Sequence, residues 1–195
     1  MYSGDVEPGA QPERPRAAVL GTRRASRVGA RLVSELGIIP TSMQALELKV
    51  PPPIVGALVA AAMWFLSRFA PQLPLPQTAK LALVGLLVAA GITFDLLGLA
   101  AFRRLRTTVN PLRPNKASAL VTSGVYKVTR NPMYVGMTLL LTAWAVHLSA
   151  LWPFIGPALF VVYISRFQIQ AEERVLRGLF GQEYADYAAR VRRWL

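Results

Sequence analysis

The residues best suited to chemistry in this chain lie in one stretch, Thr122–Gly136, with the sequence TSGVYKVTRNPMYVG. Its first half holds small and turn-forming residues and two cations, Lys127 and Arg130, and it then passes through Pro132 into a long apolar run. Proline is tolerated in the first turn of a helix, where its missing N–H costs nothing, so Pro132 predicts a helix start. Polar groups at a helix N-terminus, where a bilayer meets water, can hold an anionic or zwitterionic ligand. The stretch therefore predicts a ligand site at a membrane edge.

The acidic pair Glu172-Glu173 is the second candidate, and it follows closely on the last long apolar run. A carboxylate is a natural partner for the ammonium group of a zwitterionic ligand. The pair is positioned to return towards the Tyr126–Tyr134 cluster on the same membrane face. We therefore favour a ligand-binding role for the pair over a solvated pair at the start of a helix.

These residues resemble the motifs of the isoprenylcysteine carboxyl methyltransferases and of their relatives, the phospholipid N-methyltransferases. The pattern G-x-Y-x(3)-R-x-P-x-Y-x-G, followed by E-E-x(6)-F-G-x-x-Y, lies in the second half of the chain, from about Pro111 to Leu195. The family consists of membrane enzymes that use S-adenosylmethionine. The resemblance implies an S-adenosylmethionine-dependent methyltransferase that acts on a lipophilic or membrane-embedded acceptor.

The resemblance also implies which residues bind the cofactor. In the prenylcysteine enzymes these contacts come from a segment before the motif, a tyrosine, four residues around the proline, and an acidic residue. In this chain the corresponding positions are Ser118, Ala119, Leu120, Val121, Tyr126, Asn131, Pro132, Met133, Tyr134 and Glu172.

Two positions depart from the family pattern. Those enzymes usually have His where this chain has Asn131, and an Arg that acts on the substrate where this chain has Gln168. The nearest basic residue before the acidic pair is Arg166, and we assign the catalytic role to it. Because Asn can still donate and accept hydrogen bonds, cofactor binding survives the first change more easily than substrate identity survives the second. The acceptor need not be a prenylcysteine.

The composition indicates a membrane protein. Of 195 residues, 53% are hydrophobic and 16% are charged, which is too apolar for an ordinary soluble domain. The net charge of +12 is clustered in the N-terminal tail, between apolar runs and at the C-terminus, so it indicates membrane topology rather than nucleic-acid binding. With no Cys and one His, the sequence predicts no disulfide, thiolate metal site or histidine metal site. No dinucleotide-binding or P-loop motif is present.

Apolar runs predict an all-α integral membrane fold with about four transmembrane helices. We expect a flexible basic tail over residues 1–49 and the membrane methyltransferase domain over residues 50–195. The first two spans are expected at about Pro53–Ala70 and Leu81–Phe102. The uncharged run Asn131–Ser165 would be about 50 Å long as a straight helix, so it must turn back between His147 and Pro153.

The charge pattern predicts the orientation. Basic residues gather in the loop between the second and third spans, which places this loop, both termini and the candidate site at the cytoplasmic face. From Gln168 onward apolar residues recur at spacings of three and four, which predicts an amphipathic cytoplasmic helix that Gly178 and Gly181 break into two pieces.

Asp95 interrupts the second predicted span. A carboxylate is expensive in lipid, so we expect it to face other helices or a wet cavity. It could form an interhelical hydrogen bond, or it could serve a substrate or a proton.

Two other functions remain open from the sequence. Sterol reductases look similar around their own R-x-P-x-Y segment, so an NADPH-dependent membrane reductase is one alternative. The other is a non-catalytic membrane protein whose motif only packs helices. The expected partners are the lipid bilayer and a lipophilic small-molecule or lipid substrate, and the oligomeric state is not predicted.

Overall fold

The computed structural model describes residues 47–105 and 119–195. The predicted basic tail falls almost entirely outside these ranges, as do Ser118 and much of the predicted cytoplasmic loop. Within them the chain is all-helical, as predicted, with only two isolated β-bridges. The helical elements, in chain order, are α3 (Pro52–Ser67), α4 (Gln77–Leu105), η2 (Gly124–Lys127), α5 (Pro132–Leu148), η3 (Trp152–Phe154), α6 (Ile155–Ile164), η4 (Ser165–Ile169) and α7 (Gln170–Arg190).

Prolines set the starts of two of these helices. Helix α3 begins at Pro52 and α5 begins at Pro132, with Asn131 at the N-cap position, so both predicted starts are confirmed. A proline in the first turn gives up no intrahelical hydrogen bond and has its φ already near the helical value. The start of α5 therefore fixes where the polar part of Thr122–Gly136 ends.

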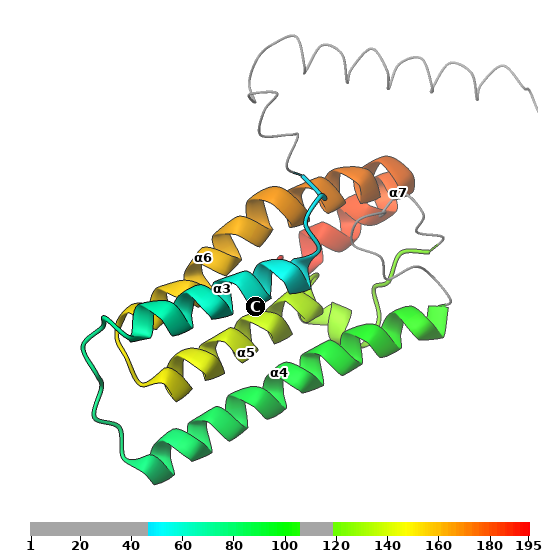
Figure 1. The fold of residues 1–195 in the computed structure, drawn as a ribbon. Helices are drawn as coiled ribbons and strands as arrows, with labels where there is room; N and C mark the ends of the chain where they lie inside the picture. Colours follow the sequence, from blue (N-terminus) through cyan, green and yellow to red (C-terminus); the bar gives the residue numbers. More distant parts are fainter. Residues whose placement is uncertain (1–46, 106–118) are drawn as a thin grey trace, which may run out of the picture. The chain divides into compact units, whose positions relative to one another are not determined.

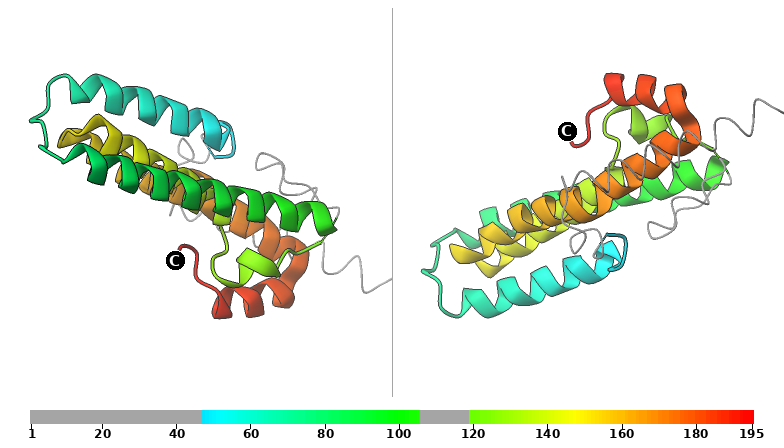
Figure 2. Two further views of the ribbon diagram at one scale, coloured as in Figure 1. Left: turned by 90° about the horizontal axis from the view of Figure 1, so that it is seen from below. Right: turned by 90° about the horizontal axis from the view of Figure 1, so that it is seen from above.

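Helices α3, α4, α5 and α6 lie side by side, and α5 contacts the other three (Figures 1 and 2). Helix α4 packs against α5, while α3 packs against α5 and α6. The indole N–H of Trp144 on α5 donates to the carbonyl of Ala60 on α3 at 3.1 Å. The buried residues of the main hydrophobic core come from α3, α5 and the α6–α7 region: Val55, Met63, Tyr134, Leu141, Ala145, Phe160, Ile164 and Ile169.

Two helical segments are long and apolar enough to cross a membrane, namely Gln77–Arg104 and Trp152–Arg190. Helices α3 and α5 are also apolar but have 16 and 17 residues. Large apolar side chains point outward from the bundle, and Leu58 and Leu86 have exposed fractions of 64% and 67%. Apolar exposure on this scale is typical of a surface that contacts other apolar groups rather than water. This surface suits the hydrocarbon of a bilayer.

The two turns that we predicted for the outer face meet each other. The Leu73 N–H donates to the Ser149 carbonyl at 2.8 Å, and the Leu151 N–H donates to the Pro71 carbonyl at 3.0 Å. Ser149 ends α5 in the left-handed conformation, with φ of 51°. Both turns lie at the end of the bundle away from α7 (Figure 1). The two turns therefore lie at the same end of the bundle, as the predicted topology requires.

Helices α6 and α7 form one continuous helical rod through the π-helical turn η4. The rod breaks at Gly181, where φ is 52° and ψ is −122°. Of the two glycines predicted to break it, Gly178 lies within regular helix. The break turns the last part of α7 back towards the start of α5, and Tyr184 and Tyr187 are buried there.

Candidate functional site

A cavity of about 70 Å³ lies where the end of α4, the segment around η2, the start of α5, and α7 come together. Six residues predicted to bind the cofactor line it: Ala119, Leu120, Val121, Tyr126, Asn131 and Glu172. The remaining lining residues are Phe102, Arg130, Glu173, Leu176, Tyr184 and Tyr187. The structure thus brings together residues that lie more than 50 positions apart in the sequence.

Glu172 is the acidic centre of this site. The Tyr134 hydroxyl and the Gln168 side-chain amide both donate to its Oε1 atom, each at 2.7 Å. The Gln168 side chain is buried in the π-helical turn one helical turn before Glu172. No described residue donates to the second carboxylate oxygen, so Glu172 can still accept a hydrogen bond from a cation in the cavity.

Tyr126 forms part of the apolar wall. Its ring is buried and packs edge-to-face against Phe102, with the ring centroids 5.6 Å apart. The Tyr187 hydroxyl donates to the Tyr126 carbonyl at 2.8 Å, which ties η2 to the last part of α7. Burial raises the pKa of the Tyr126 phenol well above its ordinary value, so it stays neutral at physiological pH.

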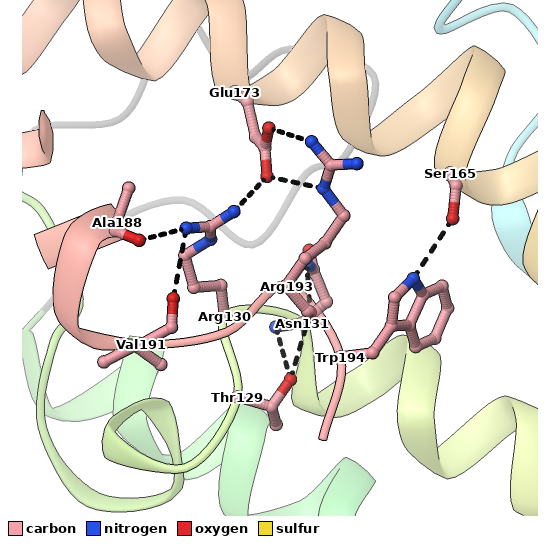
Figure 3. A network of polar contacts seen from close by, with 9 residues as sticks. All are labelled: Thr129, Arg130, Asn131, Ser165, Glu173, Ala188, Val191, Arg193 and Trp194. Carbon is pink, nitrogen blue, oxygen red and sulfur yellow. Dashed lines mark hydrogen bonds and ion pairs between the residues drawn. The ribbon is translucent and has the colours of Figure 1, made fainter.

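Glu173 has a different role from Glu172. It accepts hydrogen bonds from Arg130 Nη2 at 2.8 Å and from Arg193 Nη2 at 2.7 Å (Figure 3). Arg130 also donates through Nη1 to the carbonyls of Ala188 and Val191, at 2.7 and 3.1 Å. The Arg130 Nε–H is buried and has no hydrogen-bond partner among the described residues, although Arg130 lines the cavity. The network therefore holds Arg130 in place while leaving one donor free.

Residues 191–195, which we name the C-terminal strap, return to the start of α5 (Figure 3). The Asn131 side-chain amide donates to the Arg193 carbonyl at 2.9 Å, and the Thr129 hydroxyl donates to the same carbonyl at 3.2 Å. The Trp194 indole N–H donates to the Ser165 hydroxyl at 3.1 Å. The Asn131 side chain makes no capping bond to α5. The bond to the strap therefore already uses one hydrogen-bond donor of the Asn131 side-chain amide.

Four predicted site residues that the structure describes do not line the cavity. Tyr134 is buried in the main core and reaches Glu172 through its hydroxyl. Pro132 is buried in the first turn of α5, and Met133 lines a separate groove. The Arg166 guanidinium donates to Glu47 Oε1 at 3.4 Å and to Gln170 Oε1 at 3.3 Å. Arg166 lines neither the cavity nor the groove, so its placement gives the predicted catalytic role no support.

Several site residues were not identified from the sequence. Phe102 and Leu176 looked like ordinary span or helix-face residues, and Tyr184 and Tyr187 belonged to the predicted apolar face of the last helix. Gln168 was noted only as a departure from the family pattern. Its spacing of four from Glu172 on a helix was the signal that the two side chains meet.

Comparison with known proteins identifies the family of the chain. Residues 79–183, just over half of the chain, match the family model for phospholipid methyltransferases. An uncharacterized protein of Haemophilus influenzae is 41% identical over 63 residues, which are 32% of this chain and the whole of that protein. Protein-S-isoprenylcysteine O-methyltransferase B of Arabidopsis thaliana is 36% identical over 84 residues, or 41% of each chain. The chain therefore spans less than half the length of this second relative.

No solved structure matches the chain. The family model covers the described parts of α4, η2, α5 and α6 and most of α7, which are the elements that build the cavity. The resemblance seen in the motifs is confirmed, and the chain belongs to the phospholipid methyltransferase family of membrane methyltransferases.

Proposed function

We propose that this protein transfers a methyl group from S-adenosylmethionine to a lipophilic acceptor within the membrane. The observation that carries the proposal is the cavity at the start of α5, which gathers six of the residues that the family resemblance assigns to the cofactor. Segments from two distant parts of the chain supply them, and the Tyr134–Glu172 hydrogen bond joins these segments.

The polar groups of the cavity match the zwitterionic end of the cofactor. The second carboxylate oxygen of Glu172 can accept from the ammonium group of the methionine part. The free Arg130 Nε–H can donate to its carboxylate. Apolar side chains suited to an adenosine ring line the rest, including Phe102, Val121 and Leu176. The donor and acceptor set therefore fits S-adenosylmethionine.

The volume of the cavity sets a further requirement. Pockets for ligands of this size have roughly 300–1,000 Å³, whereas this cavity has about 70 Å³. The lining side chains must therefore move apart when the cofactor binds. The expected result is a change in solvent protection of η2 and α7 on binding, which hydrogen exchange can measure.

The chemistry requires little acid or base help. Bound S-adenosylmethionine would supply an electrophilic methyl carbon on its sulfonium. The chain would contribute by holding the charged end at Glu172 and Arg130, by orienting it, and by excluding water with the buried tyrosines.

The proposed topology has four spans, with the cavity facing the cytoplasm. Helices α3 and α5 are short for a hydrocarbon core of about 30 Å, since 16 or 17 residues extend about 25 Å. The turn after α3 contacts the turn after α5, and exposed large apolar side chains cover the outer faces of α3, α4 and α6. A polar cofactor would then enter from the cytoplasm and a lipophilic acceptor from the bilayer.

Cofactor binding to the purified full-length protein tests the proposal. Thermal shifts in detergent with S-adenosylmethionine, with its demethylated product and with NADPH should show stabilisation by the first two. Stabilisation by NADPH alone would instead support a reductase, and stabilisation by none would support a non-catalytic protein. Glu172→Gln serves as the matched variant, because it should weaken the shift while leaving the helices in place.

A further inference from the structure

A separate concavity of about 240 Å³, which we name the basic pocket, lies along one face of α7. It is lined by Gln170, Glu173, Arg174, Arg177 and Arg193. The first four residues follow one another at spacings of three, one and three, so they share a face of the helix. Arg193 reaches the pocket from the C-terminal strap, and only Glu173 also lines the cavity at the start of α5. The basic pocket is therefore distinct from the candidate cofactor site.

The ion pairs around the basic pocket leave positive charge without a partner. Among the described residues, four arginines pair with two glutamates: Arg130 and Arg193 with Glu173, and Arg166 and Arg174 with Glu47. Each glutamate can neutralise only one arginine. The side chain of Arg177 is exposed and forms no ion pair or hydrogen bond within the part of the chain that the structure describes. The pocket therefore carries a net positive charge and favours an anionic ligand.

The donors of the basic pocket suit a phosphate group. Arg193 already donates through Nε and Nη2 to Glu173, at 3.0 and 2.7 Å. The Arg177 guanidinium has no acceptor among the described residues, so its whole planar fork can donate two parallel hydrogen bonds to a phosphate. Gln170 accepts from Arg166 through Oε1 at 3.3 Å, which leaves its amide N–H groups as further donors. A phosphate has several acceptor oxygens and can therefore bond to both side chains at once.

The depth of the basic pocket follows from its neighbours along the α6–α7 rod. The rings of Tyr163 and Phe167 have their centroids 4.9 Å apart, and aromatic residues gather where hydrocarbon meets lipid headgroups. Arg174 follows Phe167 by two turns, about 10 Å along the axis. Its side chain nevertheless returns to this level, because it pairs with Glu47, next to Leu48, whose N–H donates to the Phe167 carbonyl at 3.3 Å. The pocket therefore lies at headgroup depth in a bilayer.

We propose that the basic pocket binds the phosphate group of an anionic phospholipid whose headgroup carries no amine, such as phosphatidylglycerol. The depth of the pocket favours a lipid over a phosphate dissolved in water. Its net positive charge favours a headgroup in which no amine compensates the phosphate. The lipid is held outside the candidate cofactor cavity, as a bound neighbour rather than as the methyl acceptor. The inference goes beyond the proposed methyl transfer and does not depend on it.

Three probes test this assignment on the full-length protein in a neutral detergent: phosphatidylglycerol, phosphatidylcholine with the same acyl chains, and glycerol phosphate. Titrated by thermal shift, phosphatidylglycerol should bind about tenfold or more tightly than phosphatidylcholine, and glycerol phosphate should give no shift at the same concentrations. Arg177→Gln should weaken phosphatidylglycerol binding by about tenfold or more, because it removes a charged fork. Arg190→Gln is the matched control, because it removes an equal charge from an exposed arginine of α7 outside the pocket. It should weaken binding by less than about threefold.

Two outcomes with the parent protein would overturn the proposal, so the result does not depend on a variant folding. Equal affinity for the two lipids would show that the protein does not recognise the charge of the headgroup. A comparable shift from glycerol phosphate would assign the pocket to soluble phosphates. An unchanged affinity in Arg177→Gln, or an equal loss in Arg177→Gln and Arg190→Gln, would show that the overall charge of the protein attracts the lipid and that the basic pocket does not bind it.

Discussion

The Tyr134 hydroxyl and the Glu172 carboxylate are joined by a hydrogen bond of 2.7 Å that links the start of α5 to the start of α7. Tyr134 is buried in the main core, and Glu172 lines the cavity at the start of α5. The bond therefore connects the packed part of the bundle to its polar site. Gln168 donates to the same carboxylate oxygen from the preceding turn, so the side chain of Glu172 is fixed from two directions.

The two neighbouring glutamates should respond differently to loss of charge. Glu172→Gln should weaken S-adenosylmethionine binding by about tenfold to a hundredfold, because it removes one charge-assisted hydrogen bond. Glu173→Gln should mainly lower the free energy of unfolding, because it leaves Arg130 and Arg193 without their anionic partner. Isothermal titration with the cofactor and thermal unfolding of both variants measure the two effects. Equal and small effects on binding would show that neither carboxylate holds the cofactor.

Asn131 should act through the C-terminal strap. Asn131→Ala removes the hydrogen bond to the Arg193 carbonyl and should cost about 0.5–1.5 kcal/mol of stability. Asn131→Asp should cost at least as much, because a carboxylate cannot donate to that carbonyl. The added negative charge beside Glu172 and Glu173 should also change S-adenosylmethionine affinity.

Limited digestion from the C-terminus reports on the strap directly. Both Asn131 variants should lose residues 191–195 faster than the parent does. Ser165→Ala removes the bond to Trp194, which is also in the strap, without touching the cavity. It should therefore speed digestion but leave the affinity for S-adenosylmethionine unchanged. If Asn131→Asp matches the parent in stability, digestion and cofactor affinity, the side-chain bond to Arg193 contributes nothing in solution.

The helix starts and much of the segment that lines the cavity could be predicted because they depend on local signals. Pro52 and Pro132 each open a long apolar run, which is a local signal for a helix start, and the motif residues are close together in the sequence. The partners of those residues could not be predicted in the same way. Asn131 was expected to contact the cofactor, and its side-chain amide also bonds to a carbonyl 62 residues later. The hydrogen-bond partner of this side chain depends on tertiary packing, which a local sequence pattern does not predict.

The partners of the adjacent residues Glu172 and Glu173 could not be predicted from a local pattern either. From the sequence, Glu172 and Glu173 differ only by family position. In the structure a rotation of about 100° between successive helical residues sends one to Tyr134 and the other to two arginines. Asp95 was expected to face other helices or a wet cavity. In the structure the glycines of α4 and α5 bring the two backbones so close that its Oδ1 atom lies against Gly136.

Single cysteines test the proposed topology, because the native chain has none. Leu75→Cys and Leu151→Cys lie in the two turns that contact each other and are exposed. They should react with a membrane-impermeant thiol reagent added outside intact cells. Lys127→Cys in η2 is also exposed and should react only after the membrane is permeabilised. Labelling of Lys127→Cys from outside, or of only one of the two turns, would contradict the four-span arrangement.

The contact between α4 and α5 should be intolerant of a single added methyl group at Gly136. Gly136→Ala would place its β-carbon onto Asp95 Oδ1 and close to the Gly91 carbonyl, so the helices must separate. Overpacking of this kind should destabilise the protein by about 1–3 kcal/mol. Gly85→Ala on the same α4 helix is the matched control, because its β-carbon would have no neighbour within 4 Å and the change should be neutral or slightly stabilising. Combining Gly136→Ala with Asp95→Ala should recover part of the loss, because the nearest clashing atom is then gone. Thermal unfolding of the three single variants and the double variant in nanodiscs measures this coupling. Strictly additive effects of the two substitutions would show that Asp95 and Gly136 do not constrain each other.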